Sequence, residues 1–277
     1  MTLATLSDVL TPCLTDGTAV AGLVVLGWED ATAFTRAAEA EGRPVILQAG
    51  PGCRAHTPLP VLATMFRTLA ESVSVPVVAH LDHGEDIATC ARAIDCGFTS
   101  VMYDGSALPL DENIARTAEI AALAHAAGIS IEAELGYVGY AAGKASQGTD
   151  PAQVARFAKE TRVDALAISI GNVHLMTEAS ATLDMPRLAA IQTAAPTLPL
   201  VLHGGSGLPF ELRHLLARGT NVAKVNIGTE LRQAFGQALR DTLAADPAQF
   251  DRIAILRATI PPMEQAARAA IRSLCQP

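Results

Sequence analysis

Residues 77–87 of the chain, VVAHLDHGEDI, place an apolar run directly before two histidines and three carboxylates. The polar members are His80, Asp82, His83, Glu85 and Asp86. Ionisable groups are costly to bury unless they are paired or bind a ligand. A buried strand that ends in this way therefore indicates one wall of a functional site, and the ends of other apolar runs should supply the rest.

Two further histidines, His174 and His203, follow later apolar runs just as His83 follows its own. Three neutral imidazoles with one open position are the ligand set of many catalytic zinc ions. Each histidine alone is better explained as a core or rim residue with a satisfied hydrogen bond, but three at equivalent positions favour a metal site. The metalloprotease motif HExxH is absent, and no CxxC pair offers a thiolate site.

Asp104 and Glu134 also end apolar runs, in the segments MYDGS and EAELG. Carboxylates in such places orient histidine ligands from behind or form an alternate metal position. A salt bridge at the rim of the protein would explain them as well. The sequence leaves these alternatives open.

Two turns that contain glycine, HGGSG at 203–207 and NIGTEL at 226–231, each lead from an apolar run into a helical pattern. Gly204 and Gly205 allow the backbone to approach a ligand closely, and the amides at the start of a helix attract an anion. Each turn alone is a weak signal, but both beside a candidate metal ligand indicate a phosphate site. Ser206 is disfavoured as a nucleophile because GGSG does not match the G-x-S-x-G turn.

The elements that would position these residues alternate along the chain, since eight short apolar runs are each followed by a segment with helical spacing. The runs cover residues 22–26, 44–48, 76–81, 99–103, 129–135, 165–170, 200–203 and 222–227. Near-continuous apolar strands are typical of a parallel sheet covered on both faces. Eight strand–helix units within about 250 residues predict an α/β fold of the (β/α)8 type, the TIM barrel.

The helical patterns cover residues 30–41, 58–72, 85–96, 111–127, 151–162, 186–194, 208–218 and 229–244, and an extra C-terminal helix is expected at about 247–273. No linker rich in Pro, Gly or Ser divides the chain, so residues 1–277 are predicted to form a single barrel domain. An open doubly wound sheet is the alternative, but its first turn would carry GxGxxG, and here that turn reads LGWED.

The composition disfavours several classes of partner. Half of the 277 residues are hydrophobic and 17% are charged, which suits a large core. The net charge of −8 argues against nucleic acid and anionic membranes as partners. No apolar run reaches the roughly 20 residues of a membrane span. The first residues lack the pattern of a secretory signal, and the five scattered cysteines suit reduced thiols, so a cytoplasmic location is expected.

Six motifs occur in order between residues 44 and 232: PVVAHLDHG, GFTSVMYDGSALPLDENI, IEAELG, GNVH, LVLHGGSG and KVNIGTEL. Together they resemble the class II zinc-dependent ketose-bisphosphate aldolases, which include fructose-1,6-bisphosphate and tagatose-1,6-bisphosphate aldolases. The resemblance implies reversible cleavage of a ketose (bis)phosphate into dihydroxyacetone phosphate and an aldehyde through an enediolate. It also implies a small-molecule sugar phosphate as the partner and a homo-oligomer, either a dimer or a tetramer.

The resemblance also assigns roles to residues by position. One catalytic Zn²⁺ per chain would bind His83, His174 and His203, with Asp104 and Glu134 as an alternate metal site and a monovalent cation as a further ion. Asp82 would be the acid that protonates the aldehyde oxygen. Residues of the two turns and one neighbour would contact the substrate and its phosphate: Gly204, Gly205, Ser206, Asn226, Ile227, Gly228, Thr229 and Leu175.

Three pocket positions depart from the family pattern. Val24 stands where the family has a substrate-facing Asn, Gly50 where it has a Ser, and Leu175 where it has a Gly beside the phosphate. The Tyr-Lys pair that usually follows is missing from LMTEASATLD. These changes bear on the substrate more than on the metal.

The loop after the fifth run departs as well, because it contains no carboxylate between Glu134 and Asp150. In the family, an acid in this loop removes the proton whose loss forms the enediolate. Tyr137, Tyr140 or Lys144 are the candidates to replace it.

Two other functions stay open. The chain could be a divergent family member that acts on a different singly phosphorylated or unphosphorylated ketose derivative, or a non-catalytic subunit associated with another aldolase. Such a subunit would be expected to lose the zinc histidines or Asp82, and all are present.

Overall fold

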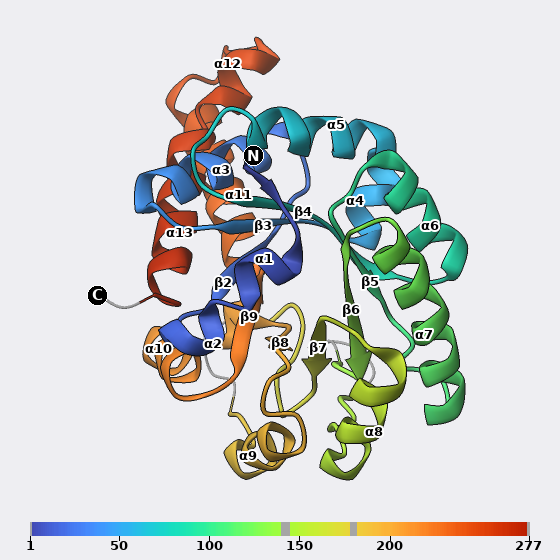
Figure 1. Cartoon of the computed structure of the whole chain (residues 1–277). Helices are drawn as coiled ribbons and strands as arrows, with labels where there is room; N and C mark the ends of the chain where they lie inside the picture. Colours follow the sequence, from blue (N-terminus) through green and yellow to red (C-terminus); the bar gives the residue numbers. More distant parts are fainter. Residues whose placement is uncertain (1, 140–144, 178–181, 276–277) are drawn as a thin grey trace.

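Eight parallel strands close into a barrel in the computed structural model, which describes residues 2–139, 145–177 and 182–275 (Figure 1). The barrel strands are β2 (Val20–Val24), β3 (Val45–Ala49), β4 (Val77–Gly84), β5 (Ser100–Tyr103), β6 (Ser130–Leu135), β7 (Ala165–Ile168), β8 (Leu200–Leu202) and β9 (Val222–Ile227). Each pairs with its neighbours in chain order, and pairing of β9 with β2 closes the ring. The TIM-barrel prediction is therefore confirmed.

The helices surround the strands, as Figure 1 shows. The outer helices are α3 (Trp28–Glu41), α4 (Pro51–His56), α5 (Leu59–Ala70), α6 (Ile87–Cys96), α7 (Leu110–Ala126), α8 (Pro151–Thr161), α9 (Met185–Ala194), α10 (Phe210–Gly219), α11 (Thr229–Ala245), α12 (Arg252–Arg257) and α13 (Ile260–Arg272), with a 3-10 turn η1 (Gly205–Gly207) before α10. Outward-facing strand residues such as Leu47, Leu81 and Ile131 pack against these helices in the main core. None of the helices in the described ranges is both long and apolar enough to cross a membrane.

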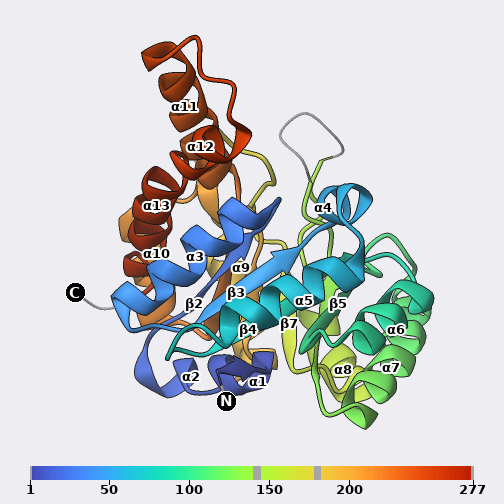
Figure 2. The same cartoon turned by 90° about the horizontal axis from the view of Figure 1, so that it is seen from above.

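A short strand and two short helices at the start of the chain cover one end of the barrel. They are β1 (Leu3–Ala4), α1 (Leu6–Leu10) and α2 (Cys13–Asp16), and α1 and α2 lie together beside the N-terminus in Figure 2. Thr5 caps α1 because its hydroxyl accepts from the Asp8 amide while the Asp8 carboxylate accepts from the Thr5 amide. Leu6 and Leu10 pack against the inward-facing residues of the barrel floor.

The inside of the barrel changes from apolar to polar along the strands. Ile46 and Val78 belong to the apolar floor, and two residues farther along the same strands are Gln48 and His80. The members of this polar layer are Gln48, His80, Ser100, Glu132 and Lys224, all 0% exposed. The carboxyl ends of the strands therefore rest on a layer of buried charged and polar groups.

The prediction of one C-terminal helix over residues 247–273 is wrong, because the segment forms two helices, α12 and α13. Pro261 and Pro262 follow directly after Ile260, the first residue of α13. Proline is tolerated in the first turn of a helix but removes a hydrogen bond farther in, so the helix must restart there. In Figure 2, α11 and α12 extend past the barrel on the side opposite α1 and α2.

Candidate active site at the carboxyl ends of the strands

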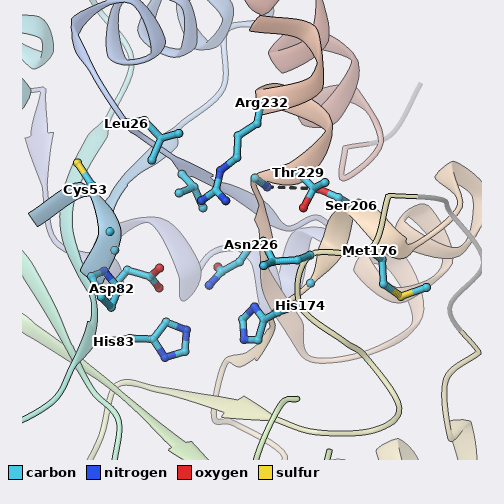
Figure 3. A pocket seen from close by; sticks show the side chains of 17 residues that line it. Leu26, Cys53, Asp82, His83, His174, Met176, Ser206, Asn226, Thr229 and Arg232 are labelled. Carbon is cyan, nitrogen blue, oxygen red and sulfur yellow. Dashed lines mark hydrogen bonds between the residues drawn. The ribbon is translucent and has the colours of Figure 1, made fainter. Parts of the chain in front are cut away.

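A cavity of about 280 Å³ opens at the carboxyl ends of the strands. Its lining comes from the ends of β2, β3, β4 and β9 and from the loops after β7 and β8 (Figure 3). Asp82, His83, His174, Leu175, Gly204, Ser206, Asn226, Gly228 and Thr229 all line it, as the sequence predicted. Gly205 and Ile227 are also part of the two turns, but both residues are buried and do not line the cavity.

The three histidines lie together beside the cavity, where His83 and His174 line it and His203 is fully buried. Their ring centroids lie 4.8 Å apart for His83 and His203, 5.4 Å for His83 and His174, and 5.3 Å for His174 and His203. One ligand atom of each lies within 4.8 Å of those of the others. The Nδ1 atom of His203 is buried and has no hydrogen-bond partner among the described residues. An imidazole nitrogen left in this state fits a metal ion bound among the three rings.

Packing between loops brings His174 to His203. The side chain of Asn172 donates to the carbonyl of His203 at 3.1 Å, which joins the loop after β7 to the end of β8. Gly204 has a φ of +69°, and a Cβ there would lie 2.1 Å from the carbonyl oxygen of Val173. Only glycine permits this backbone conformation and approach, so Gly204 allows the two loops to pack. The amide of His174 also donates to the carbonyl of Gly139, at 2.8 Å.

Asp104 and Glu134 lie next to the histidines rather than at a distant rim. Asp104 accepts a hydrogen bond from Nδ1 of His83 at 2.8 Å, and a second group that could hold a metal consists of His83, Asp104 and Glu134. Glu134 accepts from the Val138 amide through Oε1, whereas its Oε2 is buried without a hydrogen bond among the described residues and lies 3.9 Å from Nδ1 of His203. Both roles considered from the sequence, histidine orientation and an alternate metal position, are compatible with this geometry.

The charges of the cluster favour a cation. Burial raises the pKa of Glu134 to about 7. Burial lowers the pKa of His83, but the charge of Asp82 and the hydrogen bond to Asp104 outweigh it and raise this pKa to about 10. Burial and the neighbouring histidines lower the pKa of His174 to about 3. Asp82 and Asp104 thus favour a positive charge at His83, which is the charge that a divalent ion would supply there.

Glu132, Lys224 and His80 form a buried chain next to the cluster, and of these three the sequence indicated only His80. Glu132 accepts from Nε2 of His203 at 3.2 Å and from Nζ of Lys224 at 2.6 Å. Lys224 also lies 3.1 Å from Nε2 of His80, whose Nδ1 lies 2.9 Å from the Ser100 hydroxyl. The sequence does contain a feature that could have predicted this ion pair. Glu132 in SIEAEL and Lys224 in VAKVNI are opposite charges inside apolar runs.

The two glycine turns face each other across the upper part of the cavity. The Ser206 hydroxyl accepts from the amides of Gly228 and Glu230, both at 3.3 Å. Helix α11 begins at Thr229, so its first turn points amide donors towards the cavity. This arrangement is compatible with an anion site, which stays a prediction.

Arg232 is a further cavity residue that the sequence analysis missed. It lies in the first turn of α11, and its guanidinium reaches into the cavity near Leu26 and Thr229 (Figure 3). Basic residues are disfavoured near the positive end of a helix. An arginine three residues after the NIGT turn was therefore a usable signal for a second anion contact.

The departures from the family pattern all line the cavity. Val24, Gly50 and Leu175 are in its wall, and Leu26 and Met176 add further apolar surface. Leu175 has a φ of +59° and is 49% exposed. A Cβ at Gly50 would lie 3.4 Å from Oδ2 of Asp82, so the glycine leaves space beside that carboxylate.

The loop after β6 is described only in part. Tyr137 pairs with Gln147 through their backbones, at 2.8 Å in both directions. Tyr140 and Lys144, two of the three candidates for the missing loop acid, lie outside the described residues.

Comparisons with known proteins agree with this geometry. A family model described as class-II fructose-bisphosphate aldolase matches residues 4–276. A probable fructose-bisphosphate aldolase of Bacillus subtilis is 38% identical over 259 residues, covering 91% of this chain and 90% of that protein. A 6-phospho-5-dehydro-2-deoxy-D-gluconate aldolase of Shouchella clausii is 38% identical over 251 residues, covering 85% and 82%. The crystal structure of the YdjI aldolase of Escherichia coli K12 has a TM-score of 0.85 at 31% identity, covering 98% and 97%.

Proposed function

Because the chain belongs to the class II fructose-bisphosphate aldolase family, we propose that it is a zinc-dependent aldolase that reversibly cleaves a ketose phosphate into dihydroxyacetone phosphate and an aldehyde. The observation that carries this proposal is the convergence of three imidazoles beside the cavity, where the buried Nδ1 atom of His203 has no hydrogen-bond partner among the described residues. Asp82 lies beside them in the same cavity.

The ion would be held by His83, His174 and His203. Glu132 would orient His203 by accepting a hydrogen bond from Nε2 of that histidine. Since Nε2 donates to Glu132, Nδ1 of His203 carries the lone pair that a metal needs. When bound, a divalent metal polarises the ketone and stabilises the enediolate. Asp104 plays the corresponding orienting role for His83, and with Glu134 it offers the alternate position.

Asp82 would move the proton at the aldehyde oxygen. In cleavage, its carboxylate takes the proton from the hydroxyl whose carbon becomes the aldehyde, and in condensation it returns that proton. Its Oδ1 atom is buried and has no partner among the described residues, so the carboxylate is free to accept.

The substrate phosphate would lie between the two turns. Backbone amides of the 203–207 turn and of the first turn of α11 are suited to bind it. Arg232 would contact the same anion or one at the far end of the substrate. A monovalent cation near this phosphate stays a prediction.

The apolar wall of the cavity and the name of one relative support a second class of substrate. Val24 and Leu175 give the cavity apolar wall where the family pattern has an Asn and a Gly, and Leu26 adds further apolar surface. Relatives of equal identity are named for fructose bisphosphate and for a deoxy-gluconate phosphate. A ketose phosphate with fewer hydroxyl groups than fructose bisphosphate is therefore the second candidate.

The test is a panel of ketose phosphates, with released dihydroxyacetone phosphate measured by a coupled reductase. We expect metal-dependent release from at least one ketose 1-phosphate or bisphosphate, competitive inhibition by inorganic phosphate and phosphoglycolohydroxamate, and loss of activity with EDTA. An unphosphorylated ketone that competes equally well would remove the phosphate assignment. Full activity in chelated, metal-free protein would remove the metal assignment.

A further inference from the structure

Asp82 and His83 are consecutive in β4, yet both line the same cavity. Successive side chains of a regular strand point to opposite faces, so these two could not both face one site without a break in the strand. The break is visible at His83, which has a φ of +50°. The pairing of β4 with β5 also shifts register between Leu81 and Gly84.

This break is unfavourable by itself. A left-handed backbone at a residue other than glycine brings its Cβ atom too close to the following carbonyl oxygen. The strand is also tightly held just beyond it, since a Cβ at Gly84 would lie 2.6 Å from the Met102 carbonyl. The pairing of β4 with β3 ends at Leu81, so Asp82 and His83 have no registered partner in that neighbour. Something else must stabilise their peptide groups.

Arg54 meets this need. It lies in α4, the short helix that follows β3, and its guanidinium is part-buried against the end of β4. Nη1 donates to the carbonyls of Asp82 at 2.5 Å and Ala49 at 2.8 Å, and Nη2 donates to the carbonyl of His83 at 2.9 Å. One rigid, planar group thus joins the end of β3 to both residues of the break.

We propose that Arg54 is a positioning residue, whose guanidinium holds the left-handed break at His83 and thereby directs the Asp82 carboxylate and the His83 imidazole into one site. The fork of the guanidinium is essential, because two of its nitrogens bind the carbonyls of adjacent residues at a fixed spacing. Arg54 itself does not line the cavity. The effect of Arg54 on metal binding rests on the proposed function. Its effect on the backbone at residues 82 and 83 rests only on the hydrogen bonds described above.

The test compares Arg54→Met, Arg54→Lys and a control, Arg268→Met. Methionine keeps most of the stem but donates no hydrogen bond, and lysine keeps the charge without the fork. Arg268 is also part-buried and hydrogen-bonded, to Glu41, but joins α13 to α3 away from the cavity. Two quantities are measured: the zinc dissociation constant by competition with a chelator, and deuterium uptake of the peptide 77–87 in metal-free protein.

We expect Arg54→Met to raise the zinc dissociation constant about 10–100-fold, as loss of groups behind a metal ligand commonly does, and to speed deuterium uptake at 77–87. Arg54→Lys should show both effects more weakly, and Arg268→Met neither. The inhibition constant for inorganic phosphate should stay within about twofold in all three, because the phosphate turns follow β8 and β9.

Wild-type zinc affinity and wild-type deuterium uptake in folded Arg54→Met would overturn the inference. If Arg54→Met does not fold, Arg54→Lys is measured instead. Wild-type zinc affinity and wild-type deuterium uptake in Arg54→Lys would overturn the inference, because lysine lacks the forked guanidinium. Failure of the wild-type protein to bind zinc would instead refute the proposed function, while the uptake measurement on metal-free protein would still support or overturn the role of Arg54.

Discussion

Asp82 is 6% exposed and carries its charge among several cationic or potentially cationic groups. Burial would raise the pKa of its carboxyl, but the charges of His83, His203 and Lys224 outweigh burial and hold this pKa below its usual value. The group is therefore ionised before substrate enters and ready to accept a proton.

Asp82→Asn should lower kcat by about 10²–10⁴-fold, because an amide keeps the shape of the side chain but cannot transfer a proton. Zinc content should not change, since the ligands are histidines. Steady-state kinetics on the true substrate, together with metal analysis, check both parts. A near-normal kcat would mean that Asp82 only shapes the site and moves no proton.

Glu132→Gln should weaken zinc binding about 10–100-fold, because the amide is a poorer partner for His203 than the carboxylate. The same change leaves Lys224 charged and unpaired in the barrel, where it is 0% exposed. Breaking a buried ion pair in this way commonly costs about 3–5 kcal/mol of unfolding free energy. Chelator competition and urea unfolding measure the two effects separately.

The double variant Glu132→Gln/Lys224→Met provides the control. Removing both charges should recover much of the stability, whereas zinc binding should stay weak because the carboxylate is still missing. Wild-type zinc affinity in the single variant would contradict the orienting role of Glu132.

Residues of the site differ in how far the sequence could predict them. His83, His174 and His203 follow apolar runs, so their convergence follows once the barrel is assumed. Arg54 and Arg232 lie in helices. Whether their side chains contact the ends of the strands depends on how those helices are placed, and no local sequence pattern predicts that placement. Glu132 and Lys224 are read as ordinary strand residues until their pairing across the barrel is seen.

Helix α3 shows how a single element makes stability depend on pH. Asp30 lies in its first turn and is 8% exposed. Burial raises the pKa of its carboxyl from 3.8 to about 6, against the effect of hydrogen bonds from backbone amides of α3 and the preceding turn. Between about pH 4 and pH 6 the folded chain therefore binds more protons at Asp30 than the unfolded chain, and this group reduces stability as pH rises.

Asp30→Asn should remove this pH dependence. Relative to wild type, the variant should gain about 1 kcal/mol more unfolding free energy at pH 7.5 than at pH 5, since about one unit of the interval between the two pKa values, 3.8 and about 6, lies above pH 5. Urea unfolding at both pH values measures it, with Glu29→Gln as the control for loss of a neighbouring carboxylate. An equal gain at both pH values would show that Asp30 keeps its ordinary pKa.

The elements were predicted well where periodicity was strong. All eight barrel strands lie on the predicted runs because buried parallel strands are apolar along their whole length. The short helices α1, α2 and α4 were missed, since four to six residues are too few to display a helical period. The single C-terminal helix that was predicted is divided because Pro261 and Pro262 can stand only in the first turn of a helix, so α13 begins at Ile260.

At the scale of the whole molecule, the segment that extends past the barrel exposes large apolar side chains. Phe250 is 93% exposed and Ile253 65% exposed, at the turn into α12 and within it, and Trp28 at the start of α3 is 50% exposed. In Figure 2, α11 and α12 project from the barrel. Apolar surface of this kind is commonly covered by another subunit, so a homo-oligomer stays the prediction.

Light scattering after size exclusion should give a mass at least twice the 28.8 kDa of one chain. Phe250→Asp should reduce this mass, because burying a carboxylate in a subunit contact is unfavourable. Leu215→Asp is the control, since Leu215 is 57% exposed on α10. A wild-type mass of one chain at micromolar concentration would refute the oligomer.

His83, His174 and His203 are proposed to hold a metal that activates dihydroxyacetone phosphate, and hydrogen exchange in that compound tests this role without any other substrate. Loss of the carbon-bound proton precedes any contact with the aldehyde, so the unknown partner does not matter. Proton NMR in deuterated water follows the exchange, with zinc-loaded wild type, chelated wild type and His203→Ala side by side. We predict stereospecific exchange with the zinc-loaded protein alone. Absence of exchange in zinc-loaded protein, or undiminished exchange in the chelated sample, would contradict the account.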